Sequence, residues 1–88
     1  MADMKDDIMV GPTWVNAHVA AGHGAGIALV IQNKGPFSAL IYVGETAPAA
    51  NTTPGFRMVE NQPWGSELGD TVWVRSEGIS SELCVQEG

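Results

Sequence analysis

Residues 27–43 read IALVIQNKGPFSALIYV, two apolar runs separated by a polar segment with glycine and proline. Apolar residues alternate with a period of two along the first run, residues 27–32, as in a β-strand. This run is apolar on both sides, which is typical of a strand in the middle of a sandwich or at a subunit interface. Pro36 cannot donate a ladder hydrogen bond, so it belongs in the connection. The stretch therefore predicts a β-hairpin of residues 27–32 and 39–43.

Short runs of strand-forming residues also occur on both sides of this hairpin, separated by segments with glycine or proline. They cover residues 13–19, 56–59, 64–68, 71–75 and 81–86. Six or seven short strands at spacings of roughly 8 to 12 residues indicate an all-β protein. We expect a small antiparallel β-sandwich or barrel. No segment has a sustained helical period, so any helix would be one or two turns long.

The N-terminal residues differ from the rest of the chain. They are acidic and polar up to Asp7, and their one apolar cluster, Ile8, Met9 and Val10, is followed by Gly11-Pro12. We predict that residues 1–11 form an extended N-terminal arm, flexible or dependent on a partner, and that residues 12–88 form a single domain. The cluster could pair as a strand with a neighbouring subunit. The alternative is an ordinary frayed terminus.

Composition excludes several classes of protein. Four Lys and Arg against ten Asp and Glu give a formal charge of −6, the wrong sign for binding nucleic acid. No apolar run approaches the roughly 18 residues of a membrane-spanning helix, which argues against membrane insertion. The acidic start does not resemble a secretion signal. A single cysteine, Cys84, cannot form an internal disulfide, so we expect synthesis in a reducing cytoplasm.

The sequence gives little indication of catalysis. His18 and His23 lack the spacing of two metal ligands on one helix, and the glycine-rich segment of residues 22–26 lacks the ending of a phosphate-binding loop. Cys84 has acidic neighbours, not the electropositive surroundings of a nucleophilic thiol, and no evident base. We expect no enzyme activity, no catalytic residue, no metal site and no cofactor.

The three tryptophans are the candidate binding residues. Trp14 and Trp73 lie in alternating strands, where we expect them to be core or interface anchors. Trp64, in the loop-like context of residues 62–65, is the candidate ligand-facing aromatic residue. The tryptophans leave open a second class of function, a carbohydrate-binding module that attaches to the cell envelope. That alternative requires an exposed aromatic face with Trp64 accessible.

Short length and strands apolar on both faces favour a protein that buries one face against other subunits. We expect a homo-oligomer, with a trimer favoured. Its candidate interface residues are Ile8, Met9, Val10, Trp14 and Trp73. The net charge of −6 would keep the free subunit soluble before assembly.

A resemblance supports this view. Residues 28–35, ALVIQNKG, follow Trp14-Val15 and a stretch of small residues, and residues 40–43, 47–50, 69–75 and 83–87 continue the pattern. Over roughly residues 13–87, this sequence resembles small virion-associated proteins of tailed bacteriophages. Its most distinctive part is Ile31-Gln32-Asn33-Lys34-Gly35. The resemblance implies a β-rich structural component of the virion and supplies no catalytic residues.

We therefore expect a non-enzymatic virion structural protein made in the cytoplasm of the bacterial host. Capsid decoration, in which a small subunit is added to a preformed head, is the favoured role, and the arm would reach across a neighbour. The expected partners are the major capsid protein or, in the alternative role, proteins of the tail, a fibre or the head–tail connector.

Overall fold

The computed structural model describes residues 6–49 and 52–88, and these form eight β-strands and one short α-helix. In chain order the elements are β1 (Ile8–Val10), β2 (Val15–Asn16), α1 (Ala17–Ala21), β3 (Leu29–Pro36), β4 (Ala39–Val43), β5 (Phe56–Met58), β6 (Pro63–Gly65), β7 (Val72–Ser76) and β8 (Ser81–Glu87). The prediction of an all-β protein is confirmed.

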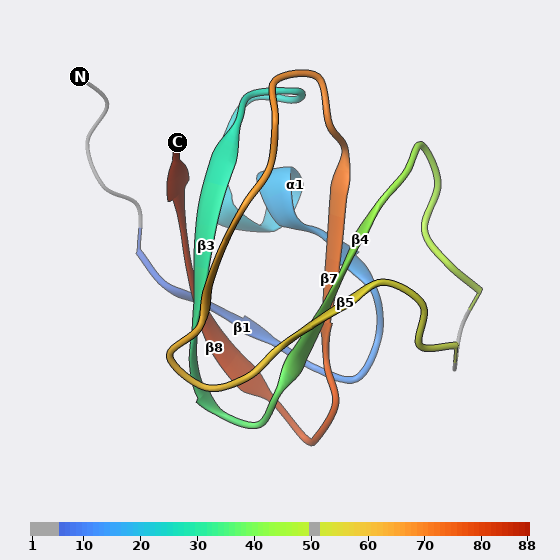
Figure 1. The fold of residues 1–88 in the computed structure, drawn as a ribbon, viewed down its shortest axis with the longest axis vertical. Coiled ribbons are helices and arrows are strands. Elements are labelled where there is room, and N and C mark those ends of the chain that lie inside the picture. Colours follow the sequence, from blue (N-terminus) through green and yellow to red (C-terminus); the bar gives the residue numbers. More distant parts are fainter. Residues whose placement is uncertain (1–5, 50–51) are drawn as a thin grey trace.

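The strands form two antiparallel sheets packed face to face (Figure 1). Sheet A has the order β1-β8-β3-β6 and sheet B the order β2-β7-β4-β5. The longest pairings, β3 with β8 and β4 with β7, lie at the centres of the two sheets. Because the described strands form two separate sheets, the fold is the sandwich and not the barrel.

The core lies between the sheets and is supplied mainly by inward residues of the strands, with Ala17 of α1 added. Its members are Val10, Ala17, Leu29, Ile31, Ala39, Ile41, Met58, Val72, Val74, Leu83 and Val85. The period-two pattern is clearest in β8, where Leu83 and Val85 are fully buried while Cys84 between them points outward and is half-buried. Alternation in the sequence therefore identified the inward residues of β8, Leu83 and Val85.

The predicted hairpin of residues 27–32 and 39–43 is wrong. β3 pairs with β6 and β8 in sheet A, whereas β4 pairs with β5 and β7 in sheet B. Both strands exist, but the chain crosses from one sheet to the other between them. Pro36, predicted to belong to the connection, is instead the last residue of β3 and lies opposite Ser81 of β8. Two features favour the crossing after it: Pro36 has no amide hydrogen for a ladder, and the Phe37 carbonyl accepts a hydrogen bond from the side chain of Asn33 at 2.9 Å.

The strand predicted over residues 13–19 is also only partly correct. β2 ends at Asn16, and α1 begins at the next residue. The Asn16 side chain accepts hydrogen bonds from the amides of His18 and Val19, and Gly22 ends the helix with a left-handed φ of 78°. An N-cap asparagine and a C-terminal glycine favour a helical turn here over a longer strand.

β1 brings part of the predicted arm into the sandwich. Ile8, Met9 and Val10 pair with Leu83, Glu82 and Ser81 of the same chain, and Val10 is 3% exposed. Residues 1–5 of the predicted arm lie outside the described residues. The rest of the arm includes an edge strand that covers one side of β8.

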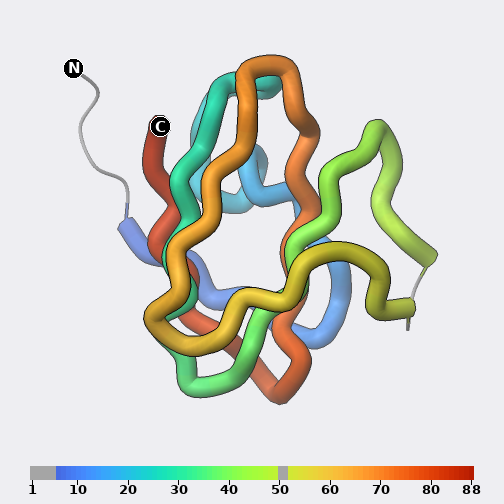
Figure 2. The backbone as a smooth tube through the Cα atoms, viewed as in Figure 1, coloured from blue at the N-terminus to red at the C-terminus, as the bar shows by residue number. Residues whose placement is uncertain are grey.

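The connections β3–β4 and β7–β8 lie at one end of the sandwich (Figure 2), where the amide of Glu77 donates to the carbonyl of Ser38 at 2.8 Å. Residues 44–49 and 52–55, between β4 and β5, extend away from the sandwich in the same view. The sequence predicted a long loop here from its prolines.

Candidate functional site

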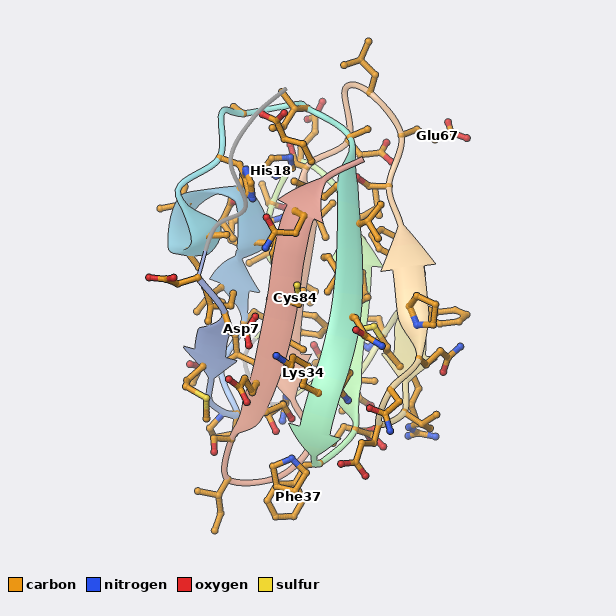
Figure 3. The ribbon with its side chains drawn as sticks, turned by 90° about the vertical axis from the view of Figure 1, so that its left-hand side faces the viewer. Asp7, His18, Lys34, Phe37, Glu67 and Cys84 are labelled. Atoms are coloured by element: carbon orange, nitrogen blue, oxygen red, sulfur yellow. The ribbon has the colours of Figure 1, made fainter. Side chains whose placement is uncertain are left out.

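The outer face of sheet A is polar, with both signs of charge. Its outward side chains on β3 and β8 are Val30, Gln32, Lys34, Glu82, Cys84 and Gln86. Lys34 Nζ lies 2.6 Å from Asp7 Oδ2, and in Figure 3 both residues lie beside Cys84 on this face. Charges that are paired with one another in this way are typical of a solvated surface.

The Asp7–Lys34 pair gives a prediction for pH titration. The hydrogen bond from Lys34 lowers the pKa of Asp7 below its usual value of 3.8, and burial opposes this only in part. Because the folded-state pKa is lowered, the stabilisation from the pair is present above pH 3.8 and is lost as the pH falls through the lowered value. We expect Lys34→Gln to return the pKa of Asp7 toward 3.8, measured by NMR of the side-chain carboxyl carbon. Lys34→Arg, which keeps the charge, should retain most of the shift; an unchanged pKa in Lys34→Gln would contradict this assignment.

The outer face of sheet B has a different composition. Because Ile41 and Val74 point into the core, their neighbours along the strands point outward. The outward residues are Asn16, Leu40, Tyr42, Arg57, Trp73 and Arg75, in two cross-strand rows. We call these six residues, together with Trp14 just before β2, the aromatic face. Among them are three aromatic rings and two arginines, but no carboxylate.

The aromatic residues of this face are half-buried and contact one another or the nearby loop. Trp14 and Tyr42 pack edge to face, with ring centroids 6.3 Å apart. The indole nitrogen of Trp14 donates to the Thr52 carbonyl at 3.2 Å, and that of Trp73 donates to the Gly44 carbonyl at 3.0 Å. Both indole N–H groups are therefore already satisfied by backbone carbonyls of the loop.

The two arginines lie on either side of Leu40, which is 2% exposed although it points away from the core. Their aliphatic stems are long enough to cover it. Arg57 forms two hydrogen bonds with the carboxylate of Glu77, at 2.6 and 2.9 Å, and this pairing raises the pKa of the Arg57 guanidinium. Arg75 lies over the ring of Trp14, 6.0 Å from its centroid.

The predicted interface residues do not form one surface. Trp14 and Trp73 both lie on the aromatic face, whereas Ile8 and Val10 of β1 point toward the core and Met9 points outward with 64% exposure. Trp64 lies on β6 opposite Ile31 and packs, half-buried, against the core. The structure thus brings together two of the three tryptophans and separates the third from them.

Both histidines have structural hydrogen bonds. His18 is 2% exposed and donates from Nε2 to the Ile27 carbonyl, and His23 Nε2 donates to the Val85 carbonyl, each at 2.8 Å. Within residues 6–49 and 52–88, no group of three or more His, Cys, Asp or Glu side chains could hold a metal ion. No helix in these ranges is long and apolar enough to cross a membrane.

Sequence reasoning missed five of the seven members of the aromatic face: Asn16, Leu40, Tyr42, Arg57 and Arg75. The signal for Arg75 was present, because period two places it on the same side of β7 as Trp73. The register that brings β4 beside β7 was not available from the sequence. Comparison of the chain with protein-family models, curated proteins and solved structures found no match.

Proposed function

We propose that this chain is a non-enzymatic structural protein of a tailed-phage virion that decorates the capsid and docks through the aromatic face. The observation that carries the proposal is the composition of that face. Trp, Tyr and Arg are the residues most enriched among those that contribute most to protein–protein binding energy. Three aromatic rings and two arginines on the outer side of sheet B give such a surface, while the opposite sheet carries a mixed polar face.

The sheet edges favour docking through a face over strand addition. The edge strands β1, β2, β5 and β6 have only two or three residues each. Short edge strands offer few unpaired backbone groups to an incoming strand. Covering the aromatic rings would therefore contribute more binding free energy than adding a strand to a sheet edge.

The resemblance to virion-associated proteins also supports this proposal. Its most distinctive part, residues 31–35, lies in β3, where Asn33 is fully buried and hydrogen-bonded. If the resemblance reflects a shared non-enzymatic fold, its most distinctive residues should stabilise the fold, as the buried Asn33 does. The expected homo-oligomer, favoured as a trimer, belongs to the same proposal.

A binding assay with phage particles tests the docking face. We expect the purified chain to bind saturably to particles produced without it, measured by pelleting. Trp73→Ala should weaken binding at least about tenfold, because truncating a central interface tryptophan typically costs 2 kcal/mol or more. The matched control is Val30→Ala, which removes an exposed apolar side chain from the opposite sheet and should leave binding unchanged.

Circular dichroism would first establish that both variants are folded. Absence of the chain from purified virions by mass spectrometry, with no binding of the wild type, would overturn the proposal. Gold labelling on the tail in electron microscopy would contradict capsid decoration and favour the tail, fibre or connector alternative.

A further inference from the structure

Arg75 differs from the other cations in the described part of the chain. Lys34 pairs with Asp7 and Arg57 pairs with Glu77, each at 2.6 Å. Arg75 is half-buried on the aromatic face and has no carboxylate partner among residues 6–49 and 52–88. A partly buried charge without a counter-charge is unfavourable, and further burial on docking would increase this cost.

The guanidinium of Arg75 is held in place but not saturated. Nε donates to the Ser76 carbonyl and Nη1 to the Thr52 carbonyl, both at 3.2 Å, and the group lies over the Trp14 ring. Arginine has five N–H donors. Two are used within the described structure, so three remain for a ligand. The group is therefore oriented before any partner arrives, which reduces the entropy lost on binding.

We propose that Arg75 receives a carboxylate from the protein surface on which the chain docks. This inference rests on the proposed function and adds the chemistry of the partner. Charge complementarity supports it. Of the two arginines at outward positions of sheet B, Arg57 is neutralised by Glu77, which directly follows β7, whereas Arg75 has no carboxylate partner among the described residues of this chain of net charge −6. An acidic partner surface is attracted to the positive charge of this face and repelled by the net negative charge of the rest of the chain. The chain therefore docks with the aromatic face toward the partner.

The surrounding groups favour a protein carboxylate over an acidic polysaccharide. A sugar bound at a Trp-rich site needs hydrogen-bond donors and acceptors for its hydroxyl groups. The indole N–H groups of Trp14 and Trp73 already donate to loop carbonyls. What these residues offer is apolar ring surface around one cation, which suits an Asp or Glu with apolar neighbours.

Arg75 variants test the proposal in the particle-binding assay. Arg75→Gln should weaken binding at least about tenfold, since removing one partner of a buried charged hydrogen bond has effects of this size or larger. Arg75→Lys keeps the charge but loses the planar fork, so it should bind with intermediate affinity. Lys34→Gln is the matched control: it removes the same charge from the opposite sheet and should bind as the wild type does.

A second experiment modifies the phage particle and leaves this protein unchanged. Particle carboxylates are converted to amides with a carbodiimide and glycinamide, and a parallel sample has its lysines acetylated. We expect amidation to abolish wild-type binding and acetylation to preserve it. If neither amidation nor Arg75→Gln weakens binding, the inference fails while the proposed function stands; if untreated particles bind no wild-type chain, the proposed function itself fails.

Polygalacturonate provides the test of the other ligand class. We expect no change in tryptophan fluorescence when it is added to the free chain, and no competition with particles at constant ionic strength. A saturable fluorescence change that Arg75→Gln removes would overturn the assignment to a protein carboxylate and favour an acidic glycan.

Discussion

Replacing Asn33 with alanine is expected to lower the free energy of unfolding by about 3 kcal/mol, a large part of the stability of a small domain. Asn33 is fully buried in β3. Its amide nitrogen donates to the carbonyls of Phe37 and Met58, both at 2.9 Å, and its carbonyl accepts from the amide of Gly35 at 2.8 Å. Alanine would leave three backbone groups without this partner, away from water.

Urea unfolding followed by tryptophan fluorescence would measure the loss. Gln32→Ala is the neighbouring control, because Gln32 points outward and its hydrogen bond is exposed; we expect a change within about 0.5 kcal/mol. Asn33→Asp keeps the shape and the acceptor but removes the donor and adds a charge, so it should also destabilise strongly at neutral pH. If Asn33→Asp is nearly as stable as the wild type, the two donated hydrogen bonds do not stabilise the fold as argued here.

The role of Asn33 shows why the sequence predicted strands better than their arrangement. Alternation in residues 81–86 marks inward and outward side chains directly, and β4 and β8 lie close to the expected bounds. Whether two successive strands pair depends on side-chain contacts around the turn. A buried asparagine that binds the Phe37 carbonyl across the turn cannot be distinguished in a sequence from a solvated turn residue.

The candidate site, like the fold, could be predicted from the sequence only in part. Trp14 and Trp73 could be selected as anchors because the sequence alternates around them, and both are on the aromatic face, Trp73 in β7 and Trp14 just before β2. Trp64 follows a proline and looked like a loop residue, yet β6 places it against the core. Its burial depends on the pairing of β6 with β3, a contact between segments about thirty residues apart, which no local pattern records.

Deleting residues 1–10 is expected to lower the free energy of unfolding by about 3 kcal/mol or more, because β1 is part of sheet A. Val10 is 3% exposed in the core, and burial of a valine side chain alone contributes about 1.5 kcal/mol or more. The deletion also removes the backbone pairing with β8 and leaves β8 as an unprotected edge. A chain that starts at Gly11 keeps the hydrogen bond from the Ser76 amide to the Gly11 carbonyl.

Two point variants separate core packing from the rest of the deletion. Val10→Ala should destabilise by about 1 to 2 kcal/mol, whereas Met9→Ala, at a position 64% exposed, should change stability by no more than about 0.5 kcal/mol.

Equal stability of the truncated and full chains would instead support the sequence-based prediction of an independent arm over residues 1–11. This distinction matters for docking, because loss of particle binding in the truncated chain identifies an arm contact only if the truncated domain is as stable as the full chain. If it is destabilised as expected, the loss reflects unfolding, and an arm contact has to be tested with Met9→Ala, which changes an outward side chain and leaves β1 in place.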